Sequence, residues 1–151
     1  MNNKPKIYLD TSVLSALYDM RLPDRQSATE EFFNRKDIYG FATSEITRQE
    51  LAQVSDMELR KKLMRLLEGI FVHPVTTEMT NLAGTYVKKM IFTPSMYNDA
   101  AHVAASVLTG QHILVSWNFK HLVNRLRRAQ INELNISMGM PMIEIISPPE
   151  V

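Results

Sequence analysis

Four polar residues stand out because each follows an apolar run or opens a helical segment. Asp10 directly follows the first apolar run of the chain, and Asn118 lies just past a later one. Glu50 lies one helical stretch after a second apolar run, and Asp99 falls in the first turn of an alanine-rich segment. In open α/β sheets ligands bind outside the carboxyl ends of the strands. We therefore expect these side chains to meet at one edge of a sheet.

Carboxylate and amide oxygens are the ligands that Mg²⁺ and Mn²⁺ prefer, and these ions keep several water ligands of their own. Such an ion can activate a water and stabilise an in-line attack on a phosphodiester. Without a cation, Asp10, Glu50 and Asp99 would repel one another, and each pKa would rise. The residue types therefore suit a Mg²⁺ or Mn²⁺ site that could act on a phosphate group, although no single one of these residues is specific for it.

The elements that must position these residues alternate between strands and helices. Continuous apolar runs predict strands over 6–9, 38–42, 71–75, 113–116 and 142–146, with Pro74 typical of an edge strand. Helical patterns cover 11–18, 27–33, 47–53, 56–68, 77–91, 98–108 and 121–132, with Pro23 as a break. This order predicts an α/β fold of three layers, a central parallel sheet of four to five strands with helices on both faces. The 151 residues fit a single domain over 1–151.

Composition excludes several classes of protein. The chain has no cysteine, which rules out a disulfide scaffold, a thiolate zinc site and a cysteine nucleophile. No run approaches the ~20 apolar residues of a membrane span, and the polar start of the chain is unlike a signal peptide. We expect a cytoplasmic protein that does not engage a membrane.

Basic residues gather in one segment although the net charge is only +1. The stretch 100–132 contains no Asp or Glu and carries four Lys and Arg side chains. These could neutralise RNA phosphates, or they could form an ordinary solvated face. The candidate RNA contacts are Lys120, His121, Arg125, Arg127 and Arg128.

Four stretches together resemble the motifs of the PIN domain family, in the same order. They are 8–14 (YLDTSVL), 44–51 (SEITRQEL), 98–104 (NDAAHVA) and 114–122 (LVSWNFKHL). The resemblance spans nearly the whole chain. It implies the fold of a small metal-dependent ribonuclease, most often the VapC-type toxin of a toxin–antitoxin pair.

By that resemblance Asp10, Glu50 and Asp99 are the acidic ligands of Mg²⁺ or Mn²⁺, and Asn118 assists them. Asn118 stands where the family more commonly has Asp, which lowers the negative charge of the site. The resemblance also implies an endoribonuclease that leaves a 5′-phosphate, with an RNA substrate and a small antitoxin partner. Glu45 is the competing candidate for the second acid, and Glu50 is preferred because Leu51 follows it as in the motif.

Several neighbouring residues have both a functional and a structural interpretation. Thr11 and Ser12 could orient a ligand, and either could cap the following helix. Ser116 could bond Asp10 or end its strand. His102 could be a general base or a metal ligand, or it could be a packed, hydrogen-bonded core residue. His121 could anchor the Asn118 loop or contact RNA. Trp117 could stack on an RNA base or belong to the core.

A partner surface and three rival functions complete the predictions. An antitoxin helix, or a second copy in a homodimer, would pack on apolar side chains of the N-terminal region, namely Val13, Leu14, Leu17, Tyr18, Phe32 and Phe33.

A haloacid dehalogenase-like phosphatase is disfavoured because Ser12 stands where it needs a second Asp. A phospho-receiver domain lacks a clear acidic pair. The remaining rival is a degenerate PIN module that binds RNA or protein without cleavage.

Overall fold

Five parallel strands form the centre of the molecule. The computed structural model describes residues 3–151, and its sheet has the order β3-β2-β1-β4-β5. The strands are β1 (Lys6–Leu9), β2 (Gly40–Ser44), β3 (Phe71–His73), β4 (Ile113–Val115) and β5 (Glu144–Ile146). All four neighbouring pairs are parallel. The predicted α/β sheet is therefore confirmed, with β3 at one edge as Pro74 indicated.

Strand β1 shows how the sheet divides the core. Its side chains alternate: Ile7 and Leu9 pack with the cluster on one face, and Tyr8 packs with the cluster on the other. All three are fully buried. Both faces are apolar because each is covered by helices, which is why the strands read as continuous apolar runs.

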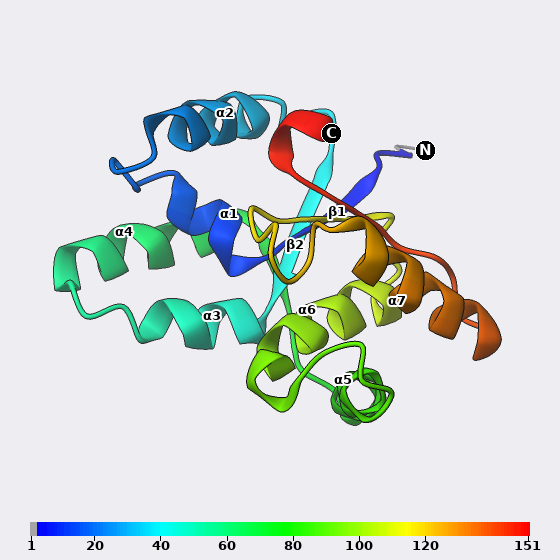
Figure 1. Ribbon diagram of the computed structural model, residues 1–151. Helices are drawn as coiled ribbons and strands as arrows, with labels where there is room; N and C mark the ends of the chain where they lie inside the picture. The colour runs from blue at the N-terminus through cyan, green and yellow to red at the C-terminus, as the bar shows by residue number, and fades with distance from the viewer. Residues whose placement is uncertain (1–2) are drawn as a thin grey trace.

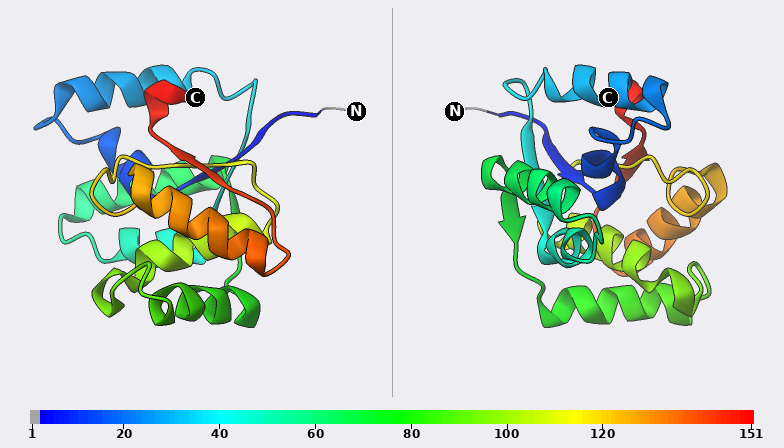
Figure 2. Two further views of the ribbon diagram at one scale, coloured as in Figure 1. Left: turned by 45° about the vertical axis from the view of Figure 1, so that its right-hand side comes forward. Right: turned by 90° about the vertical axis from the view of Figure 1, so that its left-hand side faces the viewer.

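Helices cover both faces of the sheet (Figures 1 and 2). Helices α1 (Thr11–Ala16) and α2 (Pro23–Phe33) lie on the opposite side of the strands from α5 (Thr77–Lys88), α6 (Tyr97–Leu108) and α7 (Arg125–Ser137). Helices α3 (Glu45–Ala52) and α4 (Met57–Leu66) pack with α1 in a third, smaller cluster. Short 3₁₀ turns cover Leu67–Gly69, Pro94–Met96 and Pro148–Glu150.

The second helix begins earlier than the sequence predicted. It starts at Pro23 rather than at residue 27, with the proline in its first turn. Proline suits this position because its fixed φ is helical and no backbone N–H is needed there. Pro23 therefore begins a helix rather than only ending one.

The second strand lies later than predicted. It covers Gly40–Ser44 rather than 38–42, and Ile38 is 56% exposed in the turn before it. Ser44 ends the strand and caps α3 by accepting a hydrogen bond from the Ile46 backbone N–H. For this reason α3 begins at Glu45, two residues before the predicted start.

The last helix is the largest correction, because it changes the surroundings of the site. Helix α7 covers Arg125–Ser137 rather than 121–132, with Asn124 as its cap. The predicted first turn is instead a loop, in which the Leu122 and Val123 N–H groups both bond the Asn118 carbonyl oxygen. His121 consequently lies on a loop beside the strand ends, and not on a helix.

Other boundaries differ by a few residues. Helix α5 ends at Lys88 rather than 91 because Met90 adopts a left-handed backbone, φ 62°, in the turn that follows. Helix α4 ends at Leu66, α6 begins at Tyr97, and α1 ends at Ala16. No helix within residues 3–151 has the length and hydrophobicity needed to cross a membrane.

Candidate metal and nucleic-acid site

Asp10 lies at the carboxyl end of β1 and begins α1. Its carboxylate accepts hydrogen bonds from the Ser12 hydroxyl (2.5 Å), the Ser116 hydroxyl (2.5 Å) and the Val13 N–H (3.3 Å). The helix cap predicted for Thr11 or Ser12 is thus Asp10 itself. The two serines fix the orientation of a carboxylate that is only 4% exposed.

Ser116 links the ends of β1 and β4. Its hydroxyl donates to Asp10 and accepts the Asn118 N–H at 2.9 Å. The Ser12 hydroxyl in turn accepts the Trp117 N–H at 2.9 Å. One of the two predicted roles of Ser116 was a hydrogen bond to Asp10, and the structure contains this bond.

Glu50 projects from α3 toward α6. Its Oε1 accepts from the Thr11 hydroxyl at 2.8 Å and contacts His102 Nε2 at 2.6 Å. Since an ionised carboxylate only accepts, Nε2 carries the proton. The other ring nitrogen of His102, Nδ1, lies 2.7 Å from the Tyr8 hydroxyl, and the Tyr8 hydroxyl lies 2.6 Å from the Ser44 hydroxyl.

Asp99, in the first turn of α6, faces the loop after β4. Its Oδ2 is 3.0 Å from His121 Nδ1, and its Oδ1 is 3.5 Å from the Asn118 side-chain nitrogen. The Asn118 side-chain oxygen accepts the His121 N–H at 2.9 Å. His121 therefore anchors the Asn118 loop, which is one of the two roles predicted for it.

The four predicted residues belong to one polar network at the strand ends. Asp10 reaches Asp99 through Ser116 and Asn118, and its chain neighbour Thr11 bonds Glu50. The supporting residues Thr11, Ser12 and Ser116 all take part. Glu45, the competing acid, instead pairs with Arg48 at 3.6 Å on its own helix.

The chemistry of this donor set fits a hard divalent cation, since it offers three carboxylates and an amide oxygen. Within residues 3–151, however, no group of three or more His, Asp or Glu side chains lies close enough to hold a metal ion. In this structure His102 contacts one carboxylate oxygen of Glu50, and His121 contacts one carboxylate oxygen of Asp99.

For Asp10 and Glu50 the main causes of the pKa shift are burial and neighbouring hydrogen bonds rather than the mutual repulsion that the sequence predicted. Burial raises the pKa of Asp10, against the positive charge of His102 and the bonds from Ser116 and Ser12. Burial also acts to raise the pKa of Glu50, but bonds to His102, Thr11 and Asn98 outweigh it and the pKa falls below its usual value. For Glu50 the predicted direction was wrong, because a neighbouring histidine and hydroxyl favour the ionised form.

The predicted basic residues have different surroundings. Lys120 and Arg125 are exposed. Arg127 donates to the His121 carbonyl oxygen at 2.7 Å and lies over the Phe92 ring, and Arg128 donates to the Ile145 carbonyl oxygen at 2.9 Å. Two of the four positive charges therefore also connect α7 to its neighbours, and RNA contact by this group stays a prediction.

Two alternatives are resolved toward packing. Trp117 is 8% exposed and donates from Nε1 to the Thr29 hydroxyl at 2.8 Å, so it is a core residue. The predicted partner surface is wrong in part, because Val13, Leu14 and Phe32 are fully buried. The exposed apolar side chains of this region lie on the turn between α1 and α2 and are Tyr18, Met20 and Leu22.

Sequence reasoning missed the partners of His102. Its spacing of three from Asp99 suggested that the two share a helix face, but His102 contacts Glu50 and Tyr8, which are 52 and 94 residues away. Neither Tyr8 nor Ser44 was singled out. Tyr8 carried a signal: it is the one polar-tipped side chain in a β1 that is otherwise apolar after Lys6.

Comparison with known proteins gives a likeness in structure. No family model and no curated protein matches the sequence. Among solved structures, the chain resembles VapBC from Salmonella typhimurium bound to DNA, at TM-score 0.61 and 16% identity over 95% of this chain and 98% of that one.

Two further structures give similar values. VapBC2 from Rickettsia felis, bound to a promoter DNA fragment, matches at TM-score 0.59 and 14% identity over 94% of this chain and 98% of that one. VapBC-5 from Mycobacterium tuberculosis matches at TM-score 0.53 and 18% identity over 94% and 98%. At such low identity the likeness concerns the fold, and we conclude that this chain has the PIN-domain fold of VapBC toxin–antitoxin structures.

Proposed function

We propose that the protein is a metal-dependent endoribonuclease that hydrolyses RNA phosphodiester bonds. The observation that carries the proposal is the placement of three acids at the carboxyl ends of β1 and β4: hydrogen bonds through Ser116 and Asn118 connect Asp10 to Asp99, and Glu50 bonds Thr11, the chain neighbour of Asp10. Three acids from separate elements, in a fold shared with VapBC structures, supply the ligand types that Mg²⁺- or Mn²⁺-dependent phosphodiester hydrolysis uses.

Asp10, Glu50 and Asp99 would hold the ion, with Asn118 contributing its amide oxygen. When bound, Mg²⁺ or Mn²⁺ would supply an activated water and charge stabilisation at the phosphate. The chain's own residues position the ligands. Ser12 and Ser116 fix the Asp10 carboxylate. His102 and Thr11 orient Glu50.

His121 and the basic side chains have a separate task. His121 holds Asp99 and the Asn118 loop, so it keeps the third and fourth candidate residues in register. Exposed Lys120 lies two residues after Asn118, and Arg125 begins α7. Their charges would attract the phosphates on either side of the cleaved bond.

We further propose that the protein is the toxin of a toxin–antitoxin pair. The solved structures it resembles are VapBC complexes, and one from Klebsiella pneumoniae is a toxin-antitoxin complex. The exposed Tyr18, Met20 and Leu22 offer an apolar surface for a small antitoxin or for a second copy of this chain. If Met20 and Leu22 form this surface, Met20→Glu should weaken the complex without lowering the melting temperature.

A non-catalytic PIN module is the second candidate, and two observations favour it. Asn118 replaces an acid, and the described residues contain no ready three-ligand group. Such a module would bind RNA or protein through the same strand ends.

One experiment separates the two candidates. Purified wild type is incubated with end-labelled single-stranded RNA in Mn²⁺, Mg²⁺ or EDTA, alongside Asp10→Ala, Asp99→Ala and the control Glu45→Ala. The nuclease is supported if cleavage needs metal, is lost in both Asp variants and persists in the control. Undiminished cleavage in EDTA, or by both Asp variants, overturns it. RNA binding without cleavage in any condition identifies the non-catalytic module.

A further inference from the structure

A cavity of about 550 Å³ adjoins the candidate metal site on the side of α1 and α2. Two network residues form part of its wall: Ser12, which donates a hydrogen bond to Asp10, and Asn118, whose side-chain nitrogen lies 3.5 Å from Asp99. The remaining lining comes from α1, the start of α2 and the loop after β4, and consists of Ser15, Ala16, Asp19, Leu22, Arg25, Trp117, Phe119 and Lys120. A volume of this size is in the usual range for a small organic ligand.

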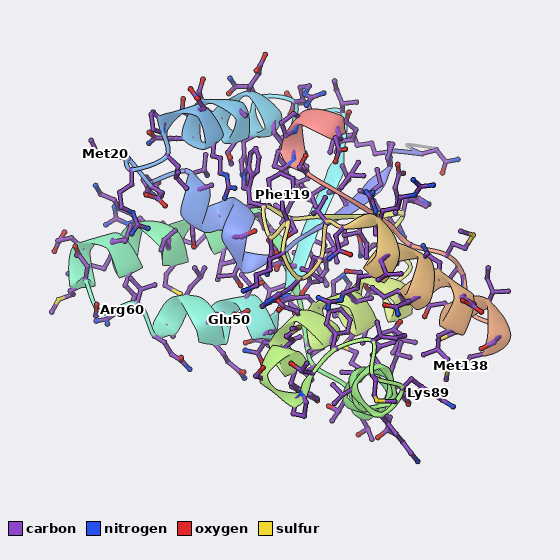
Figure 3. All side chains as sticks on the ribbon, in the orientation of Figure 1. Met20, Glu50, Arg60, Lys89, Phe119 and Met138 are labelled. Atoms are coloured by element: carbon purple, nitrogen blue, oxygen red, sulfur yellow. The ribbon has the colours of Figure 1, made fainter. Side chains whose placement is uncertain are left out.

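Arg25, Trp117 and Phe119 form an aromatic and cationic cluster in the cavity wall. The Arg25 guanidinium carbon lies 5.3 Å from the Trp117 ring centroid and 5.4 Å from that of Phe119. The two rings meet edge to face at 6.0 Å. Trp117 is buried, whereas Phe119, labelled in Figure 3, is 45% exposed, so of the two rings Phe119 is the one more accessible to a ligand.

The charge of the cavity favours an anion. Neither Arg25 nor Lys120 forms an ion pair within residues 3–151. The single acidic lining residue, Asp19, is engaged by Arg21 at 2.9 Å, which holds its pKa below the usual value. The cavity lining therefore carries two cations and one carboxylate; that carboxylate is paired with Arg21 and is also attracted by the charge of Arg25.

We propose that this cavity, the Phe119 pocket, binds one unpaired nucleotide of the RNA strand next to the phosphate that lies at the acids. The inference rests on the nuclease function proposed above and adds a nucleotide site to it, with a base stacked on Phe119 and a flanking phosphate at Arg25 and Lys120. Aromatic rings beside cations are how proteins bind unpaired bases with little sequence preference. A base within a duplex is covered on both faces and cannot enter.

The test uses RNA binding in EDTA, where no cleavage occurs. A six-nucleotide single-stranded RNA carrying fluorescein is titrated with the full chain, and its anisotropy gives the Kd. Trp117 is the only tryptophan and lies in the pocket wall, so its fluorescence reports occupancy. The single strand should change both signals, whereas the same sequence as a duplex should leave Trp117 fluorescence unchanged.

Two matched pairs of variants locate the binding. Phe119→Ala should raise the Kd about 5- to 100-fold, whereas Phe119→Tyr, which keeps a ring, should retain affinity. Phe71→Ala is the control, since Phe71 is 64% exposed at the start of edge strand β3. Arg25→Ala should weaken binding more than Arg65→Ala, which removes the same charge from a separate cavity between α3 and α4.

The outcomes separate this proposal from the nuclease itself. If Phe119→Ala and Arg25→Ala bind RNA as tightly as wild type, the pocket is not a nucleotide site, whatever the cleavage assay shows. A Trp117 signal that responds to a protein partner and not to RNA also overturns it. Binding that depends on Phe119 but is never followed by cleavage supports the pocket and contradicts the nuclease.

Discussion

Asp10 and Glu50 are proposed ligands of one cation, yet their surroundings act on them in opposite directions. Burial raises the pKa of Asp10, so its ionised form destabilises the folded state. The pKa of Glu50 is lowered despite burial, because His102 and Thr11 bond its ionised form. Two acids of one site therefore contribute to stability with opposite signs when no metal is bound.

The two neutral isosteres test this difference in EDTA. At pH 7, Glu50→Gln should lower the free energy of unfolding by about 1 to 2 kcal/mol, because it weakens a charged hydrogen bond to His102. Asp10→Asn should be neutral or stabilising, because it removes a buried charge. Thermal melts measure both, and a shift of 1 kcal/mol is about 2 to 4 °C for a chain of this size.

The pH dependence of the two differences follows from the pKa directions. Ionised Glu50 stabilises wild type above about pH 4, and this is lost as the pH falls through its lowered pKa. The deficit of Glu50→Gln should therefore vanish in acid. For Asp10, wild type loses stability as the pH rises from about 4 through its raised pKa, so any gain of Asp10→Asn should also shrink in acid. A Glu50→Gln deficit that grows in acid contradicts the assigned role of His102.

His102 gives a second prediction at this scale. His102→Ala removes the hydrogen-bond donor of Glu50 and a hydrogen-bond partner of the Tyr8 hydroxyl, both in buried surroundings. Partners that orient metal ligands typically contribute 10- to 100-fold in affinity or activity, so Mn²⁺-dependent cleavage should fall by about that factor. Tyr8→Phe is the control: it keeps the His102–Glu50 bond and should retain more activity. Equal losses in both would show that His102 acts only through packing.

Position along the chain indicated Asp10, Asp99 and Asn118, which follow strands or open a helix, but it did not indicate their partners. Glu50 lies near the end of α3 and was preferred to Glu45 only by the family resemblance. The contacts of His102 span 52 and 94 residues, a separation that no local spacing encodes. The pKa of Glu50 was mispredicted for the same reason.

Among the elements, the start of α7 decides the geometry of the site loop. The helical pattern predicted a helix start at residue 121, four residues too early. In this loop, which packs at a strand end, polar and apolar side chains are spaced as they are in a helical turn. The Asn118 carbonyl oxygen accepts two backbone N–H groups, and this turns the chain before Asn124 can begin α7. Capping side chains are readable in sequence, but the choice between neighbouring caps depends on tertiary contacts.

Asn124 should therefore matter for both the helix and the loop. It caps α7 by accepting the Arg127 N–H at 2.8 Å and donates to the Lys120 carbonyl oxygen at 2.9 Å. Asn124→Ala should cost about 1 kcal/mol in thermal or denaturant unfolding and should weaken RNA binding, whereas Asn124→Ser should keep most of the stability. Unchanged stability of Asn124→Ala would show that the cap contributes nothing.

Helices α5 and α7 are joined by one buried hydrogen bond. The Tyr86 hydroxyl donates to the Asn135 side-chain oxygen at 2.6 Å, and Asn135 is fully buried. Asn135→Ala should cost about 1 to 3 kcal/mol because it leaves the tyrosine hydroxyl unpaired, and Tyr86→Phe should cost less. The double variant should be less destabilised than the sum of the two. Strict additivity would mean that the bond couples nothing.

At the scale of the whole molecule, the fold concentrates its chemistry at one end of the sheet. The parallel strands deliver Asp10 and Asn118 at neighbouring carboxyl ends, and α3 and α6 bring Glu50 and Asp99 to them. The alternation of apolar runs and helices sufficed to predict this architecture, because both sheet faces are buried. The strand order was not predicted, since it depends on which helices cross over the sheet.

The most direct test is the anomalous diffraction of a crystal of the full chain soaked in Mn²⁺. We expect one Mn²⁺ peak or a close pair in contact with carboxylate oxygens of Asp10, Glu50 and Asp99. The same soak of Asp99→Asn should give a weak peak or none. Mn²⁺ that binds elsewhere on the chain, or equally well in Asp99→Asn, would contradict the assignment of these three acids as one metal site.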